Sequence, residues 1–174
     1  MKPRFIPIFF FIALVAVFTW RLVYPPGTAV YSQLVNREIP PLSLPSARPG
    51  QPPVTSASLA TGKPQLVNLF GSWCVPCMAE APNLMRLKQE GVSIVGIAIR
   101  DRPSAVAAFL GEHGDPFGAI GLDSDSRAQV ALGSGGVPET FVVDGKGVIR
   151  RQFIGGLDAD SLPEVRRALA EAAQ

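Results

Sequence analysis

The two cysteines of this 174-residue chain, Cys74 and Cys77, stand two residues apart. An apolar run of strand length, residues 65–70, precedes them, and a segment with helical character, residues 78–90, follows. The N–H groups and the positive dipole end at the start of a helix favour the thiolate form of a cysteine. Such a thiolate can attack a disulfide, and the second cysteine can then resolve the mixed disulfide. The spacing therefore predicts a redox-active pair.

Two structural uses of a cysteine pair compete with redox chemistry. A disulfide across so short a loop removes little entropy from the unfolded chain, about 2 kcal/mol in the loop-closure model, so it would stabilise the fold weakly. A zinc site needs four ligands, and besides the cysteine pair the chain offers a single histidine, His113. Redox exchange is the favoured interpretation, and no metal site is predicted.

Two motifs carry a resemblance to a known family. The residues from Trp73 to Cys77 read Trp-Cys-Val-Pro-Cys, which resembles the thioredoxin superfamily. Residues 136–141 read Gly-Val-Pro-Glu-Thr-Phe, which is similar to the signature of a narrower branch. That branch is the membrane-anchored thiol:disulfide interchange proteins of cytochrome c maturation (the CcmG/DsbE type). The resemblance covers roughly residues 38–170 and implies a thioredoxin-like α/β fold, a mixed central sheet flanked by helices.

The resemblance assigns roles to the residues of both motifs. Cys74 is expected to be the exposed nucleophile and Cys77 the buried resolving thiol, with Trp73 flanking and shielding the nucleophile. In the superfamily the proline at position 138 is cis and faces the cysteines. The backbone of Val137 is then free to pair with an extended substrate, so Val137 and Pro138 are expected to form a docking edge.

Three further residues bear on proton transfer. Asn68 stands six residues before Cys74, where ordinary thioredoxins carry a buried aspartate. Its amide cannot titrate, and we expect it to satisfy buried backbone groups. Glu80 follows Cys77 by three residues and could accept its proton or raise thiol pKa values by like-charge repulsion. A solvated helix glutamate is the alternative, and the resemblance favours the first interpretation because the branch often has an acid here. Glu139 is a second candidate for tuning the thiols.

The N-terminus differs in composition from the remainder. Residues 1–4 are basic, residues 5–20 are apolar and uncharged, and residues 21–24 extend the run to about the 20 residues that span a bilayer. The run is long for a signal peptide and no clear Ala-x-Ala cleavage site follows it, so an uncleaved signal-anchor over residues 1–24 is favoured over a cleaved leader. A proline-rich linker, 25–37, and a thioredoxin-like domain, 38–174, are predicted to follow.

Charge constrains location and partners. The chain has 16 Lys and Arg against 14 Asp and Glu, and Lys2, Arg4 and Arg21 lie in the N-terminal segment, so the domain is nearly neutral and nucleic-acid binding is not expected. The basic N-terminus would remain in the cytoplasm. A single-pass protein of the bacterial inner membrane with its catalytic domain in the periplasm is predicted.

The predicted reaction is dithiol–disulfide exchange, with no cofactor other than the redox-active Cys74–Cys77 disulfide. A dithiol in an oxidising compartment needs a source of electrons. The resemblance implies a reductase that receives electrons from a membrane thiol transporter. Such a reductase would keep the haem-attachment cysteines of apocytochrome c, or those of a thiol protein of its maturation, reduced.

Three other functions are compatible with parts of the sequence. A thiol-disulfide reductase for another envelope client would use the same residues and differ in its partner. A redoxin-type peroxidase would need Thr-x-x-Cys, and residues 70–73 before Cys74 lack it. A non-enzymatic copper carrier would need a histidine near the cysteines.

Overall fold

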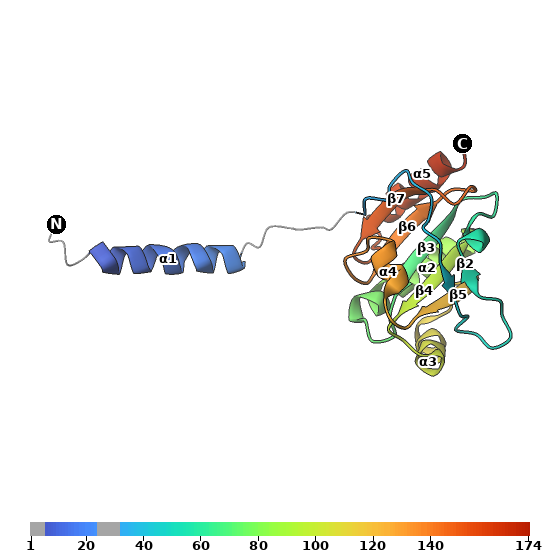
Figure 1. Ribbon diagram of the computed structural model, residues 1–174, viewed down its shortest axis with the longest axis horizontal. Coiled ribbons are helices and arrows are strands. Elements are labelled where there is room, and N and C mark those ends of the chain that lie inside the picture. Colours follow the sequence, from blue (N-terminus) through green and yellow to red (C-terminus); the bar gives the residue numbers. More distant parts are fainter. Residues whose placement is uncertain (1–5, 24–31) are drawn as a thin grey trace.

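The computed structural model describes residues 6–23 and 32–174 (Figure 1). Its helices are α1 (Ile6–Val23), the short 3-10 helix η2 (Ala57–Leu59), α2 (Val75–Gln89), α3 (Pro103–His113), α4 (Arg127–Ala131) and α5 (Leu162–Ala172). Its strands are β1 (Ser43–Leu44), β2 (Val54–Thr55), β3 (Gln65–Phe70), β4 (Ile94–Ile99), β5 (Ala119–Asp123), β6 (Glu139–Val143) and β7 (Ile149–Ile154).

Five strands form one mixed sheet in the order β5-β4-β3-β6-β7. Strands β3, β4 and β5 are parallel, and β6 runs antiparallel to both β3 and β7. Every residue of β3 and β4 is buried, as their apolar runs require of central strands covered on both faces. The predicted thioredoxin-like architecture is confirmed.

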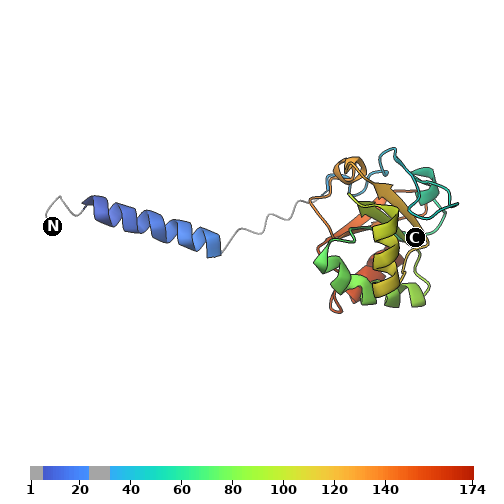
Figure 2. The ribbon, with the colours of Figure 1, turned by 90° about the horizontal axis from the view of Figure 1, so that it is seen from below.

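Alternate side chains of β3 point into two separate cores. Leu66 and Phe70 pack with side chains of α2, α3 and α5, in the core that also holds both cysteines. Figure 2 shows these three helices on one side of the sheet and α4 on the other. Val67 and Leu69 pack on the other face with side chains of β1, β2, η2 and α4. The cysteines therefore belong to one face of the sheet, and β1, β2, η2 and α4 cover the other.

Helix α1 bears on the predicted membrane anchor. It has 18 residues, which at 1.5 Å per residue is about 27 Å, against about 30 Å for a bilayer core. Within residues 6–23 and 32–174, no helix combines the length and apolar character that crossing a membrane requires. The transmembrane helix predicted over residues 1–24 is not confirmed. Its basic start, residues 1–4, and the linker residues 25–31 lie outside the described residues.

An N-terminal arm, residues 32–48, lines both edges of the sheet. Beside β7, the Asn36 N–H donates to the Ile149 carbonyl (2.7 Å) and the Ile149 N–H to the Arg37 carbonyl (2.9 Å). Beside β5, the Ala47 N–H donates to the Ile120 carbonyl (2.9 Å). The last residues of the predicted linker, 32–37, thus pack against the domain.

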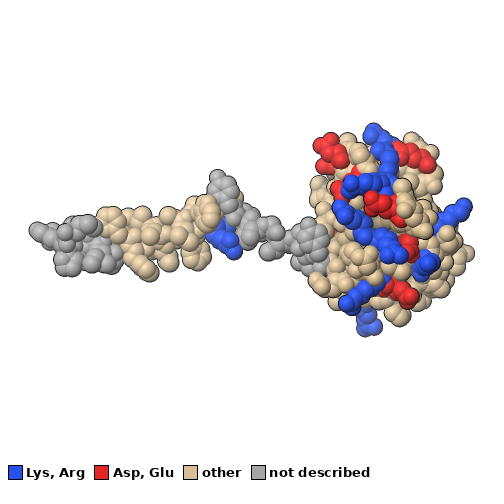
Figure 3. Space-filling view, turned by 90° about the horizontal axis from the view of Figure 1, so that it is seen from above, with Lys and Arg blue, Asp and Glu red and all other residues tan. Residues whose placement is uncertain are grey.

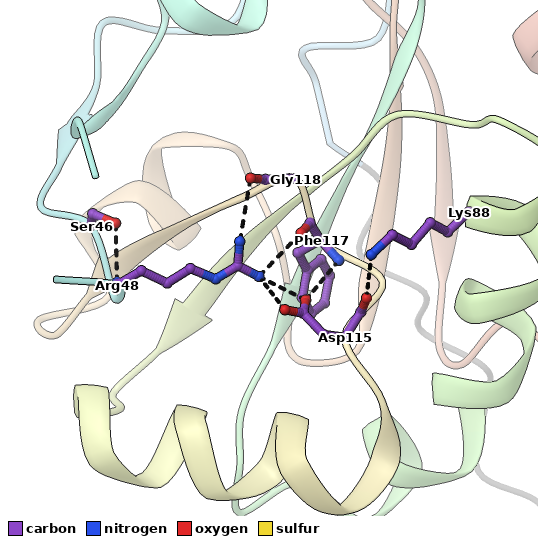
Figure 4. Close-up of polar contacts among 6 residues, drawn as sticks. All are labelled: Ser46, Arg48, Lys88, Asp115, Phe117 and Gly118. Carbon is purple, nitrogen blue, oxygen red and sulfur yellow. Dashed lines mark hydrogen bonds and ion pairs between the residues drawn. The ribbon is translucent and has the colours of Figure 1, made fainter. Parts of the chain in front are cut away.

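An arginine fixes the far end of this arm. The guanidinium of Arg48 lies 2.6 Å from a carboxylate oxygen of Asp115 and donates to the Phe117 carbonyl at 3.1 Å (Figure 4). The Lys88 ammonium donates to the Asp115 carbonyl (2.7 Å), so the same loop is also joined to α2. These contacts hold the arm against the loop that leads into β5.

Charged side chains of both signs are interspersed on the face of the domain drawn in Figure 3. Ion pairs within the domain include Arg150 with Asp144, Arg151 with Glu164, and Arg166 with Glu90.

Candidate active site

Cys74 and Cys77 form a disulfide at the start of α2, with their Cα atoms 5.3 Å apart. Cys74 is the N-cap residue, and its sulfur accepts a hydrogen bond from the Cys77 N–H at 3.2 Å. Both are buried in this oxidised form, and Cys74 is only 4% exposed. The predicted exposure of Cys74 is therefore wrong for the oxidised form, because the sulfur at the cap faces the core. Its neighbours Trp73 and Val75 are exposed instead.

The segment before Cys74 is fastened to the end of β4. The Asp101 carboxylate accepts hydrogen bonds from the Ser72 N–H (2.7 Å), the Ser72 hydroxyl (3.0 Å) and the Arg102 N–H (2.9 Å). The Trp73 indole N–H donates to the Ile99 carbonyl (3.1 Å). Sequence reasoning missed Asp101. Its position directly after a buried parallel strand, where active-site residues of α/β proteins gather, was the available signal.

Replacing Asp101 with alanine is expected to lower the free energy of unfolding by about 1–3 kcal/mol, because three donors lose their acceptor. Disulfide exchange is expected to slow several-fold, since the segment leading to Cys74 is released. Urea unfolding of the oxidised protein and turnover of a peptide disulfide measure the two effects. Asp125→Ala, in an exposed ion pair with Arg127, is the control and should change stability by less than about 0.5 kcal/mol. Equal effects of the two substitutions would contradict a fastening role for Asp101.

Glu80 lies on α2 one turn beyond Cys77 and is 2% exposed. One carboxylate oxygen accepts from the Asn68 side-chain amide and the other from the Leu157 N–H, both at 3.0 Å. Burial raises the pKa of Glu80 from 4.5 to about 7, against the opposing effect of these two hydrogen bonds. The alternative of a solvated glutamate is wrong. A role in proton transfer stays a prediction.

Asn68 does not satisfy buried backbone groups, contrary to the prediction. Its amide nitrogen donates to Glu80 and to the hydroxyl of Thr140, both at 3.0 Å. Its amide oxygen is buried and has no hydrogen-bond partner among the described residues. Register pairs Asn68 with Thr140 across β3 and β6, so both side chains face α2. The amide therefore fixes the glutamate and not the main chain, and Thr140 is a second residue that sequence reasoning missed.

The Val137–Pro138 peptide bond is cis, as the resemblance implied. Gly156 lies close to both this proline and the cysteine motif, which shows that the two are neighbours. A Cβ atom there would lie 3.5 Å from the Pro76 carbonyl oxygen, 3.7 Å from the Glu80 Cβ and 3.8 Å from the Pro138 Cγ. The structure thus brings Pro138, Glu80 and the cysteine segment together, while substrate docking by Val137 and Pro138 stays a prediction.

Glu139 follows Pro138 but contacts other groups. It is opposite Leu69 in the register, so its side chain lies on the face of the sheet opposite to α2. Its buried carboxylate accepts from the Gly135 N–H (3.0 Å) and from the Gln152 amide (2.8 Å). Tuning of the thiols by Glu139 stays a prediction, and the contacts observed are with the loop that precedes Pro138 and with β7.

His113 ends α3 and packs against Phe109, with ring centroids 5.0 Å apart. Within residues 6–23 and 32–174, no three His, Cys, Asp or Glu side chains are grouped to hold a metal ion.

Three features together are typical of the thioredoxin-like oxidoreductases. A disulfide lies at the start of a helix, a strand precedes that helix, and a cis-proline lies close to the disulfide. These proteins exchange a dithiol for a disulfide through a mixed-disulfide intermediate. The fold and the cysteine pair place this chain in that class.

Comparison with known proteins gives the particular family. The chain belongs to the redoxin family, which it matches over residues 34–169. It is 37% identical over 160 residues to the thiol:disulfide interchange protein HelX of Rhodobacter capsulatus, covering 91% of this chain and 90% of the relative. It is 34% identical over 163 residues to the thiol:disulfide interchange protein DsbE of Escherichia coli, covering 90% and 87%. The chain is thus a dithiol–disulfide oxidoreductase of the DsbE/HelX type.

A solved structure supports the fold independently. The thiol:disulfide interchange protein of the thioredoxin family from Chlorobium tepidum superposes with a TM-score of 0.62 at 24% identity, covering 79% of this chain and 96% of that protein. At this identity the match supports the fold alone.

Proposed function

We propose that this protein is a periplasmic reductase that keeps cysteines of apocytochrome c, or of a thiol protein of its maturation, reduced for haem attachment. The reductive direction is proposed from the resemblance to the thiol:disulfide interchange proteins of cytochrome c maturation. The observation that supports the exchange step itself is the buried carboxylate of Glu80, one turn beyond Cys77, whose pKa burial raises to about 7. A reductase must remove the proton from its resolving thiol at the moment of attack. A group that titrates near neutral pH can accept that proton and return it.

The proposed cycle balances two electrons and two protons. Cys74 first ionises and releases its proton to solvent. The thiolate of Cys74 attacks one sulfur of the client disulfide, and the other client sulfur leaves as a thiolate that takes up that proton from solvent. Cys77 gives its proton to Glu80 and attacks the Cys74 sulfur, which breaks the mixed disulfide and releases the second client thiolate. Glu80 returns the proton to that thiolate, and the enzyme is left oxidised. A membrane thiol-electron transporter then restores the dithiol, and no further cofactor takes part.

A trapping experiment tests the client. In Cys77→Ser, Cys74 forms a mixed disulfide that cannot resolve, so the partner remains attached and mass spectrometry identifies it. The expected catch is an apocytochrome c or a thiol protein of its maturation. Cys74→Ser/Cys77→Ser is the control and should catch nothing. A catch made up of other envelope proteins would favour a reductase for a different client, and an empty trap with intact copper binding would favour the carrier.

The proposed location rests on the sequence of the N-terminus. We propose that residues 1–24 attach the catalytic domain to the periplasmic side of a bacterial inner membrane. Cell fractionation followed by alkaline carbonate extraction should leave the protein in the membrane pellet. Protease added to spheroplasts should remove the domain. A protein recovered in the soluble cytoplasmic fraction would contradict this location.

A further inference from the structure

A chain of buried hydrogen bonds connects the N-terminal arm to the loop before the cis-proline. The Ser32 N–H donates to the Gln152 side-chain oxygen at 2.7 Å, and the Gln152 amide nitrogen donates to one oxygen of Glu139 at 2.8 Å. The other oxygen of Glu139 accepts from the Gly135 N–H at 3.0 Å. Ser32, Gln152 and Glu139 are all buried. Residues that are 120 positions apart thus join in one network.

Ser32 also holds the start of the same loop. Its hydroxyl donates to the Leu132 carbonyl at 2.6 Å. Gly133 has a positive φ of 66°, and a Cβ atom there would lie 3.0 Å from the Ser32 hydroxyl. The arm and the loop are therefore in close contact at Gly133. The network forms hydrogen bonds on either side of this residue, with the Leu132 carbonyl and the Gly135 N–H.

The chemistry of Gln152 suits this position. A buried carboxylate requires donors, and the structure pairs Glu139 with two neutral N–H groups. Only the nitrogen end of the Gln152 amide can face that carboxylate, so its oxygen end is turned to the Ser32 N–H. The side chain is thereby fixed in one orientation, and each bond of the network sets the direction of the next.

The loop concerned, residues 133–136, is tied at its start to α4, by the Gly133 N–H to the Val130 carbonyl (3.0 Å) and the Ser134 N–H to the Gln129 carbonyl (3.1 Å). The Ser134 hydroxyl donates within the loop, to the Gly136 carbonyl (2.9 Å), and the bond from Gly135 to Glu139 joins the loop to β6. The loop reads Gly-Ser-Gly-Gly, a sequence with a large conformational entropy. A loop that binds an extended partner through its backbone loses that entropy on binding, unless it is ordered beforehand. External bonds at Leu132 and Gly135 are a means of ordering it.

We infer that Ser32 and Gln152 are positioning residues. Through Glu139 they pre-order the loop 133–136, which leads into the docking edge at Val137. The effect on client binding rests on the proposed function, in which a polypeptide client docks at Val137. The N-terminal arm then takes part in client binding although it does not contact the cysteines.

The test uses the full-length protein with Gln152→Leu and Ser32→Ala. For Gln152→Leu, the KM for a peptide disulfide is expected to rise about tenfold, which is the value of one lost ordering hydrogen bond. The rate with a small acyclic disulfide such as bis(2-hydroxyethyl) disulfide should stay within about twofold, because a small molecule does not dock on the loop. Ser32→Ala should raise the same KM by a smaller factor.

Gln65→Leu is the matched control. Gln65 is also buried, and its amide nitrogen donates to the Leu59 carbonyl at 2.8 Å. It lies at the other end of β3, where it pairs with Val143 and not with Glu139. Loss of the Gln65 amide should lower the stability of the protein without a selective rise in the KM for the peptide disulfide. An equal rise in KM for Gln65→Leu, or an equal loss of rate with the small disulfide for Gln152→Leu, would overturn the inference.

Hydrogen exchange at Gly135 separates this inference from the proposed function. Its N–H is expected to exchange about tenfold faster in Gln152→Leu and at the wild-type rate in Gln65→Leu, whatever the client is. If the exchange at Gly135 accelerates but the peptide KM does not move, the network orders the loop and the docking role of Val137 is wrong. Unchanged exchange at Gly135 would overturn the positioning role itself.

Discussion

Replacing Cys74 with serine is expected to abolish catalysed disulfide exchange, with a loss of at least about 10³-fold in turnover. A serine hydroxyl does not ionise at neutral pH and cannot form a mixed disulfide, whereas the thiolate of a helix N-cap cysteine is stabilised by the N–H groups around it. In the structure the Cys77 N–H already points at the Cys74 sulfur. Reduction of a peptide disulfide, followed by chromatography of the products, measures the loss.

The matched variant is Cys77→Ser. It should also fail to turn over, but it should form one equivalent of mixed disulfide in a single round, because Cys74 remains. Mass spectrometry of the acid-quenched reaction distinguishes the two variants. If Cys74→Ser were the variant that accumulated the mixed disulfide, Cys77 would be the nucleophile and the assigned order of attack would be reversed.

Replacing Glu80 with glutamine is expected to remove most of the pH dependence of stability between pH 4.5 and 7. Burial raises the pKa of this acid in the folded protein from 4.5 to about 7. The folded state therefore binds more protons than the unfolded state in that window. The contribution of Glu80 to stability should be fully present below pH 4.5 and be lost as the pH rises to 7, by about 3 kcal/mol. Glutamine has no charge to desolvate, so its curve should be flatter.

Urea unfolding of the oxidised proteins at several pH values measures this difference. Glu90→Gln is the control on the same helix. Arg166 lowers the pKa of Glu90 by a hydrogen bond and by its charge, so its contribution is present above the ordinary pKa and is lost as the pH falls. Glu90→Gln should leave the decline between pH 4.5 and 7 in place. Parallel curves for wild type and Glu80→Gln would mean that Glu80 is not the group responsible.

The sequence predicts the fold well because its signals are local. Residues 65–70 and 94–99 are apolar runs of strand length, and both are buried central strands in the structure. The cysteine pair follows the first of them after three residues, and Pro76 fits the first turn of a helix, where its missing N–H costs nothing. Each of these features is contained within a few residues, which is why the sequence is sufficient to locate the cysteine pair at the start of a helix.

The partners of the carboxylates could not be predicted in this way. Glu139 is next to Pro138 in sequence, yet the pleat of β6 turns its side chain to the face away from α2. The sequence predicts hydrogen bonds from Asn68 to buried backbone groups, whereas its observed hydrogen bond to Glu80 depends on how α2 packs on β3. The contact between Asp101 and Ser72 joins loops that are 29 residues apart. Such contacts depend on packing between segments that are distant in sequence, and the local pattern of residue types carries no information about that packing.

The arm that lines β5 and β7 has a consequence for how client chains leave. An enzyme that exchanges disulfides with extended polypeptides repeatedly meets chains that could add to an open sheet edge. Beside Ile149 and Ile120 that place is already taken by the enzyme's own backbone, at Arg37 and Ala47. A client is thereby prevented from adding as an extra strand at these positions, where many backbone hydrogen bonds would slow its departure. The arm thus favours brief encounters, which a catalyst of repeated exchange requires.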